Sequence, residues 1–218
     1  MEYFVITYTG KPIGESGESC STEYILDEAC ETCGTGAKLS GSLKTKKLNK
    51  AKKNFFQTVD GDYLISEELH IKLVEKGIKI GDLDKVVDFK NNQLTFYHLY
   101  TELSFPKTTN FSGLIIDSQC QTCKRNGYFN DVIIGDLEKN IPTKVIPLEL
   151  NYSDLNLDLK KQSDFFNSWE HMGLSNREAK GNLVVRYARP MLIVSERLKI
   201  VLEEERLENL KFDVIKID

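Results

Sequence analysis

Two C-x-x-C pairs constrain this chain more than any other feature of its sequence. Cys30 and Cys33 form the first pair, and Cys120 and Cys123 form the second, at a constant offset of 90 residues. Two cysteines three positions apart in a tight turn can direct both sulfurs at one ion, and two such turns complete the tetrahedral shell that zinc prefers. The sequence therefore predicts one structural Zn²⁺ ion, held by four thiolates from two separated knuckles.

The residues around the two pairs also match. Each copy has apolar residues, an aspartate (Asp27 or Asp117), two spacer residues and then C-x-T-C. We interpret each copy as the end of a strand that turns into a knuckle, with the aspartate capping the turn or hydrogen-bonding near the ligands. Gly34, after the first pair, suits a backbone with positive φ. Lys124 stands at that place in the second copy, which predicts a looser second turn.

A closed shell of four sulfurs leaves no open position for water or substrate, so the expected ion stabilises the fold and does not catalyse. One alternative is a redox protein, which needs only one C-x-x-C on a thioredoxin-like unit. Another is a set of four ordinary buried thiols. The fifth cysteine, Cys20, has no partner motif and is expected to be a free thiol.

A disulfide framework is not expected for these cysteines. The chain begins with an apolar run from Met1 to Ile6 that has no basic leader and no small-residue cleavage site, so the run is predicted as a first strand and not as a signal peptide. A cytoplasmic location follows as an expectation, and cytoplasmic thiols are kept reduced.

A second internal similarity joins residues 64–73 and 193–202 at a constant offset of 129. In each segment an apolar strand end leads to a serine (Ser66 or Ser195) suited to N-cap a helix, with glutamate in the first turn. Leucines four residues apart give each helix an apolar stripe, and Gly77 predicts the end of the first helix. An internal duplication or one device used twice explains the similarity. The unequal spacing from knuckle to helix favours the second explanation. Further strands are predicted at residues 85–89, 94–99, 182–187, 190–194 and 212–217.

Composition and charge exclude some classes of function. A chain of 218 residues can bury a substantial core, and no stretch approaches the roughly 20 apolar residues that a membrane span requires. The net charge of −4 argues against a dedicated nucleic-acid binder. Residues 38–54 hold seven lysines and no acidic residue. Because aromatic residues are not interleaved with these lysines, a solvated loop or exposed helix is favoured over a nucleic-acid contact.

Catalytic signatures are scarce. His70, His98 and His171 are scattered, and no glycine-rich phosphate loop occurs. We therefore predict no catalytic residues, no organic cofactor and no enzymatic activity. Residues 151–164 are polar and are predicted as a long connection, and Trp169 is expected to pack in the core instead of forming a surface patch.

These patterns together predict a mixed α+β fold. It should contain largely antiparallel strands and a few helices, tied together by the Cys₄ zinc site. We predict a single domain over residues 1–218, which can be divided into an N-terminal subdomain (about 1–105) and a C-terminal one (about 106–218).

The two knuckles and the closing segment 190–198 resemble the double-CXXCG-motif immunity proteins of bacterial polymorphic toxin systems. The resemblance assigns the zinc-ligand role to Cys30, Cys33, Cys120 and Cys123. It implies a bacterial protein that binds and neutralises a cognate protein toxin by forming a stoichiometric complex. No toxin-binding residues carry over, because such surfaces vary with the toxin. The alternative function is a zinc-containing nucleic-acid-binding or regulatory protein that uses the lysines of residues 38–53.

Overall fold

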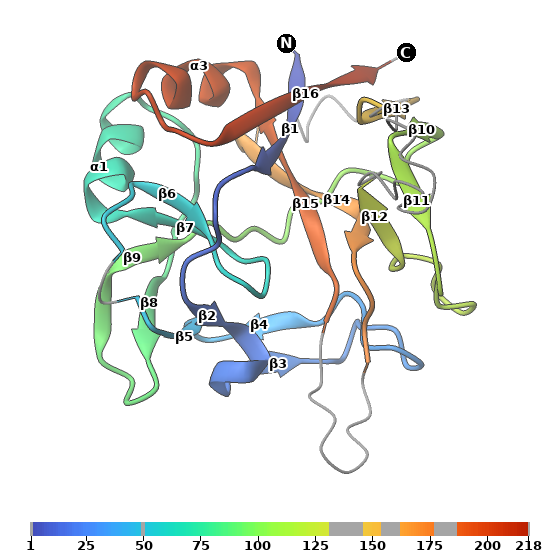
Figure 1. Cartoon of the computed structure of the whole chain (residues 1–218), viewed down its shortest axis with the longest axis horizontal. Helices are drawn as coiled ribbons and strands as arrows, with labels where there is room; N and C mark the ends of the chain where they lie inside the picture. Colours follow the sequence, from blue (N-terminus) through green and yellow to red (C-terminus); the bar gives the residue numbers. More distant parts are fainter. Residues whose placement is uncertain (1, 49–50, 131–145, 154–161, 177–186, 218) are drawn as a thin grey trace, which may run out of the picture.

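The computed structural model describes residues 2–48, 51–130, 146–153, 162–176 and 187–217. Within these residues the protein is mostly β-sheet, with two α-helices and one short 3-10 helix, η1 (Gly17–Cys20). The sheets are barrel-like, and most strand pairs are antiparallel. The predicted mixed fold is therefore confirmed in outline (Figure 1).

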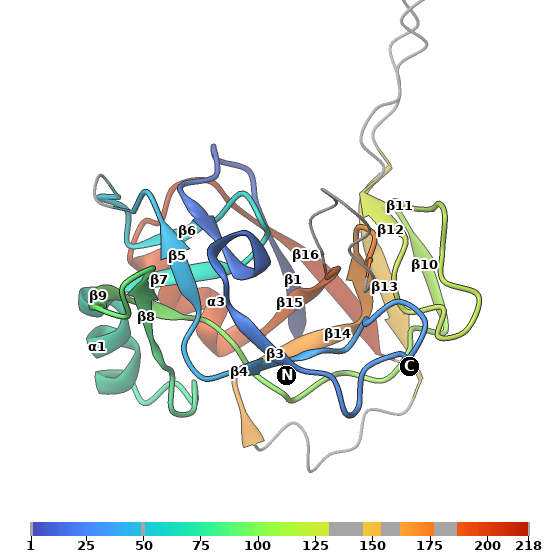
Figure 2. The ribbon, with the colours of Figure 1, turned by 90° about the horizontal axis from the view of Figure 1, so that it is seen from below.

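The strands form three sheets. The smaller of the two main sheets has the order β2 (Glu15–Ser16), β5 (Lys44–Lys46), β8 (Lys85–Asp88), β9 (Gln93–His98), β7 (Tyr63–Ser66), β6 (Phe55–Gln57). The larger has the order β10 (Asn110–Ser112), β13 (Glu149–Tyr152), β16 (Leu210–Ile217), β1 (Tyr3–Tyr8), β15 (Arg189–Ser195), β14 (Phe165–Met172), β12 (Tyr128–Asn130), β11 (Leu114–Ile116). A separate two-stranded sheet pairs β3 (Glu23–Ile25) with β4 (Lys38–Ser40); it lies near the bottom of Figure 1, beside β2 and β5, and Figure 2 shows the molecule from that side.

The first six strands of the larger sheet repeat the smaller sheet position by position. In both sheets the outermost pair is antiparallel, the next pair is parallel, and the three remaining pairs are antiparallel. The chain visits equivalent strands in the same sequence, except that β1 from the N-terminus occupies the place that β9 has in the smaller sheet. We call residues 15–98 the first half, and residues 110–217 together with β1 the second half.

Within the described residues, each half has an α-helix that follows the equivalent strand. Helix α1 (Glu67–Glu75) follows β7, and α3 (Glu196–Glu204) follows β15. The side chains of Ser66 and Ser195 accept the amide hydrogens of Leu69 and Leu198, at 3.1 and 3.2 Å, which confirms both predicted N-caps.

The same serine hydroxyls also tie the helices to the preceding strands. Ser66 Oγ donates to Asn54 Oδ1 at 3.0 Å, and Ser195 Oγ donates to Asp164 Oδ1 at 2.6 Å. Asn54 and Asp164 each precede a Phe-Phe pair at the start of β6 or β14, so one hydrogen-bonding pattern joins equivalent strands and helices in both halves.

The helices also end alike. Gly77 has φ of 68°, and Arg206, at the same offset of 129, has φ of 50°. Gly77 thus terminates α1 as predicted, and an arginine takes the same left-handed conformation after α3.

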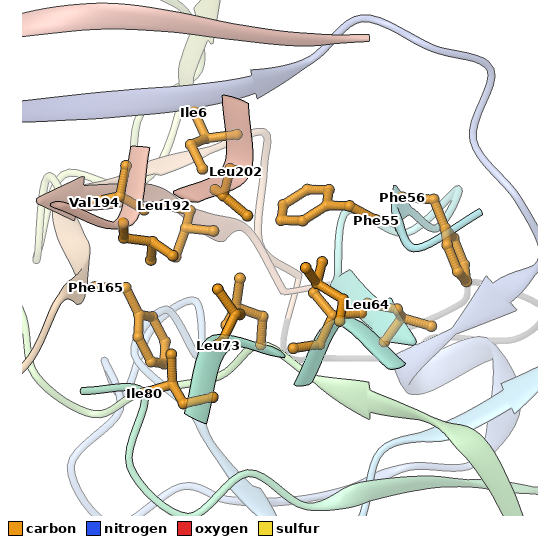
Figure 3. Packing of buried hydrophobic residues seen from close by; sticks show 14 of the residues in the cluster. Ile6, Phe55, Phe56, Leu64, Leu73, Ile80, Phe165, Leu192, Val194 and Leu202 are labelled. Carbon is orange, nitrogen blue, oxygen red and sulfur yellow. The ribbon is translucent and has the colours of Figure 1, made fainter. Parts of the chain in front are cut away.

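The larger core cluster lies where the two halves meet. Strands β1, β14 and β15 contribute alternate residues to it, including Ile6, Phe165 and Val194. The first half contributes residues such as Phe55 and Leu73, and Figure 3 shows these side chains converging. The intervening residues of β1, β14 and β15 face a second cluster on the other side of the larger sheet, which contains Tyr3, Val5, Phe166, Met191 and Ile193. This alternation is the period of two expected for a sheet covered on both faces.

The topology also bears on predicted boundaries. Strand β1 pairs with β15 and β16, so the first strand of the chain belongs to the sheet of the C-terminal strands. The division into subdomains near residue 105 stays a prediction, but β1 pairs with strands of the predicted C-terminal subdomain. Residues 38–54 are not a loop or helix throughout, because β4 and β5 lie there. The predicted connection 151–164 begins with the end of β13; residues 154–161 and 182–186 lie outside the described residues.

Candidate metal centre

Each knuckle lies at the tip of a two-stranded hairpin. The first knuckle joins β3 to β4, and the second joins β11 to β12. The second hairpin is anchored, since β12 pairs with β14 of the larger sheet, whereas β3 and β4 pair only with each other in the described chain. Cys120 and Cys123 are therefore attached to a large sheet, and Cys30 and Cys33 to a small one.

The four predicted cysteines lie together. Their sulfur atoms are all within 4.8 Å of one another, with 3.9 Å between Cys30 and Cys120 and 3.7 Å between Cys33 and Cys123. No disulfide joins them. Four thiol groups converging from two turns are compatible with a bound metal ion, and residues far apart in the sequence supply them.

The two turns close in the same way despite their different sequences. The amide of Gly34 donates to the carbonyl of Cys30 at 2.7 Å, and the amide of Lys124 donates to the carbonyl of Cys120 at 2.9 Å. Gly34 has φ of 79° and Lys124 has φ of 55°. The expected looser second turn is thus not found: Lys124 adopts the left-handed conformation that glycine adopts more readily.

The two cysteines of each pair differ in acidity. Burial raises the pKa of the Cys30 thiol, but amide hydrogens of Cys33 and Thr32 donate to its sulfur and the net pKa is lowered. The same balance, with the amides of Cys123 and Thr122, lowers the pKa of Cys120 to about 7.

The second cysteine of each pair is shifted the other way. Burial is the main cause that raises the pKa of Cys33, and burial raises that of Cys123 to about 12. Two amides of each turn therefore donate to the first sulfur, whereas the second sulfur receives one amide, from Thr35 or Arg125, and is the more deeply placed. Metal binding requires all four as thiolates, so an ion would displace protons chiefly from Cys33 and Cys123.

The surroundings of the sulfurs contain residues that the sequence did not single out. The hydroxyls of Thr32 and Thr122 meet at 2.8 Å, so the equivalent threonines of the two knuckles are in contact. The amide of Cys120 donates to Asn126 Oδ1 at 2.9 Å. Thr35 Oγ1 lies 3.0 Å from Cys33 Sγ and bonds Ser175 Oγ at 2.9 Å. The C-x-T-C repeat was the one signal that could have identified the threonine contact.

The two aspartates were predicted to cap the turns or to hydrogen-bond near the ligands, and neither carboxylate bonds a cysteine within the described residues. Asp27 is exposed. Asp117 Oδ1 accepts a hydrogen bond from the neighbouring Ser118 hydroxyl at 3.1 Å. Its backbone amide donates to Gly127, where a side chain would collide with the Asp117 carbonyl, so Gly127 and not the carboxylate shapes this turn.

The other candidate residues lie apart from the cluster. Cys20 is a free thiol, as predicted, buried in η1. His70 is half-buried and stacks on Tyr97 with 4.0 Å between ring centroids. Trp169 is half-buried, with Lys107 and Arg125 over its ring. Lys38, Lys46, Lys47 and Lys53 of the lysine-rich segment all contact groups within the protein.

No helix in the described ranges has the length and apolar character needed to cross a membrane. Comparison of the chain with protein-family models, with curated proteins and with solved structures finds no match.

Proposed function

We propose that the four cysteines bind one zinc ion that stabilises the fold. In a tetrahedron with Zn–S bonds of about 2.3 Å, neighbouring sulfurs are about 3.8 Å apart. The sulfurs of Cys30 and Cys120, at 3.9 Å, and of Cys33 and Cys123, at 3.7 Å, match this spacing. A site made entirely of thiolates suits zinc better than magnesium or calcium, which prefer oxygen ligands.

The position of the cluster supports a structural role. An isolated two-stranded hairpin is at best marginally stable in water. The β3–β4 hairpin has only two strands, and the cysteines connect its tip to the hairpin that continues the larger sheet. An ion there would cross-link segments about 90 residues apart and hold the small sheet in place.

On this scaffold we propose an immunity function: the protein binds a cognate bacterial toxin and neutralises it by stoichiometric complex formation, without catalysis. Two observations support this. The knuckles that carry the resemblance to double-CXXCG-motif immunity proteins converge in space, and the closing segment has the strand–Ser-Glu helix–strand pattern of that family. The convergence of the cysteines is the observation that contributes most.

Co-expression with the protein encoded beside this gene tests the proposal. The neighbour should kill cells when expressed alone, and this chain should rescue them and co-purify with it in a one-to-one complex. A Cys30→Ser chain should lose both effects, and Cys20→Ala should keep both. Killing that proceeds despite a folded, metal-loaded chain would rule out that neighbour as the cognate toxin. Zinc itself is tested separately, by metal analysis of freshly purified protein.

A further inference from the structure

A small cavity lies beside the metal centre and has no role in holding the metal. Its volume is about 290 Å³, near the lower end of the roughly 300–1,000 Å³ of ligand pockets. It is lined by residues of both knuckle hairpins, including Gly36 and Arg125, and by β9 and β15 of the two main sheets. Any occupant must therefore be small.

One wall of the cavity presents a cation without a counter-ion. Arg125 forms no ion pair within the described residues, and its buried Nε has no hydrogen-bond acceptor. The guanidinium lies over the Trp169 ring at 5.9 Å. A Cβ at Gly36 would lie 2.9 Å from Arg125 Nη1, so the first knuckle leaves room for this side chain by having none of its own. A guanidinium held by packing and free of carboxylates suits an incoming oxyanion, which it can bind through two parallel hydrogen bonds.

Arg189, the other arginine of the lining, differs in this respect. It bonds Asp62 at 2.8 Å and Glu18 at 3.0 Å, so its charge is already balanced. The free oxyanion-binding capacity of the cavity therefore resides in Arg125.

Other parts of the cavity lining favour a positively charged group in the ligand. Lys38 bridges Glu28 at 2.8 Å and Glu102 at 3.1 Å, so one ammonium group serves two carboxylates and a negative charge is left over. His98 is 94% buried, with its Nε2 3.7 Å from Asp62 Oδ1 and no partner for Nδ1. The tautomer with the proton on Nε2 directs it at Asp62 and leaves Nδ1 as an acceptor. This side of the cavity favours a hydrogen-bond donor, preferably a positively charged one.

The polar lining is not a requirement of the fold. In the second half, the positions equivalent to Asp62 and His98 are Met191 and Val5, and both pack in an apolar cluster. The same frame can thus carry apolar side chains at these positions, and the first half places Asp62 and His98 there instead.

We propose that the cavity binds a small zwitterion, an α-amino acid or close analogue, with its carboxylate on Arg125 and its ammonium group toward His98 and the Glu28–Glu102 pair. Neither the zinc nor the immunity proposal is needed for this inference, since every group it uses belongs to the cavity.

Thermal unfolding of the full-length, metal-loaded protein with each of the common L-amino acids provides the test. At least one should raise the melting temperature saturably, and its α-amide, which lacks the carboxylate, should not. In Arg125→Gln the apparent affinity should fall by at least about tenfold, because a charged hydrogen-bonding pair is lost. Lys107→Gln is the matched control, since it removes the other cation over Trp169 without altering the lining, and it should bind as the wild type does.

No saturable effect from any amino acid would overturn the proposal, and so would equal binding by wild type and Arg125→Gln. If Arg125→Gln loses its metal, nitrogen NMR of the wild type replaces it. The bound amino acid must then shift the His98 Nδ1 and Arg125 Nε signals, and unchanged signals at both would equally refute the site.

Discussion

The two halves of the molecule share a backbone plan and differ in what they bury. Strand order, strand direction, helix caps and knuckle turns are common to both. On one face of the second half, Val5, Met191 and Ile193 form part of an apolar cluster. On the equivalent face of the first half, Asp62 and His98 are buried beside Arg189. The shared features are those that determine the backbone conformation. The side chains on this face are not among them, so they could differ between the halves without changing the fold.

The cysteine cluster is where the halves are most alike. Each supplies two sulfurs from equivalent positions, and the threonines between them touch. Cys30→Ser and Cys120→Ser should therefore be equally damaging, each removing the ion and several kcal/mol of stability, up to the order of 10 kcal/mol that structural zinc contributes in finger peptides. Metal content and denaturant unfolding measure this. Cys20→Ala is the control that removes a cysteine and should keep one ion per chain. A large difference between the two ligand variants would show that the halves do not share the site equally.

The next largest effect concerns the buried histidine of the first half. Burial lowers the pKa of His98 from 6.5 to about 4; Asp62 and Asp84 oppose this shift, Arg189 reinforces it, and the neutral Tyr100 ring stacks on the imidazole. In the unfolded chain His98 binds a proton below about pH 6.5, whereas in the folded chain it does so only below about pH 4. The free energy of unfolding therefore decreases as the pH falls between those two values. From pH 7 to pH 5 the loss is about 2 kcal/mol.

His98→Val makes this position like Val5 of the second half and should abolish that part of the pH dependence. Urea unfolding of both proteins at pH 7 and pH 5 gives the difference. Buried His171 and the thiols remain in both proteins and cancel, and the lowered pKa of Asp62 places its own titration below this range. An unchanged pH dependence in the variant would show that His98 is not held neutral.

A smaller effect is expected at the ends of the helices. Arg206 has φ of 50° where the first half has Gly77. Replacing Arg206 with glycine should relieve the left-handed strain and stabilise the protein by roughly 0.5–1 kcal/mol, after allowing for the greater freedom of glycine in the unfolded chain. Glu208→Gly, an exposed change in the same loop without a positive φ, should give no gain. Equal effects of the two substitutions in denaturant unfolding would mean that the helix ends are not equivalent in energy.

The sequence predicted the local features of these halves and not their relation. Both knuckles and both capped helices were recognisable because each repeats within a short window at a constant offset. The offsets differ, however: 90 for the knuckles, 110 for Phe55 and Phe165, and 129 for the helices. They differ for two main reasons. Residues 41–43 separate β4 from β5, whereas residues 131–148 separate β12 from β13, and residues 58–62 separate β6 from β7, whereas residues 173–188 separate β14 from β15. In the sequence alone, these unequal spacings favoured independent use of the same local motifs over an internal duplication. The strand order favours an internal repeat instead.

Contacts between side chains that are far apart in the sequence also could not be predicted. Nothing near Arg125 indicates that Gly36 leaves space for it, and nothing near His98 indicates that Asp62 and Arg189 lie beside it. Such contacts depend on which strands become neighbours, and the place of β1 in the second half was not recognisable from local pattern.

The repeat makes one last prediction, with the smallest expected effect. Strand β1 is the first strand of the chain but occupies the place of the last strand of the second half, and both chain ends are marked at the top of Figure 1. In the first half, β8 and β9 are joined by a short hairpin between the paired residues Val87 and Gln93. In the second half, Ile215 pairs with Tyr3, so residue 218 and residue 1 could be joined by a short glycine–serine linker to make the equivalent hairpin.

A circular permutant opened between Gly10 and Lys11 and closed by that linker should keep the fold, bind one ion and melt within a few degrees of the wild type. Deleting residues 1–9 without reattaching them is the control, and it should prevent folding because β1 lies between β15 and β16 with nearly every side chain buried. A permutant that fails to fold as the deletion does would mean that β1 must precede the rest of the chain. An internal repeat whose last strand has moved to the N-terminus requires that this strand works equally well at either end of the chain. If it does not, the two halves resemble each other only in their folded arrangement and are not interchangeable units.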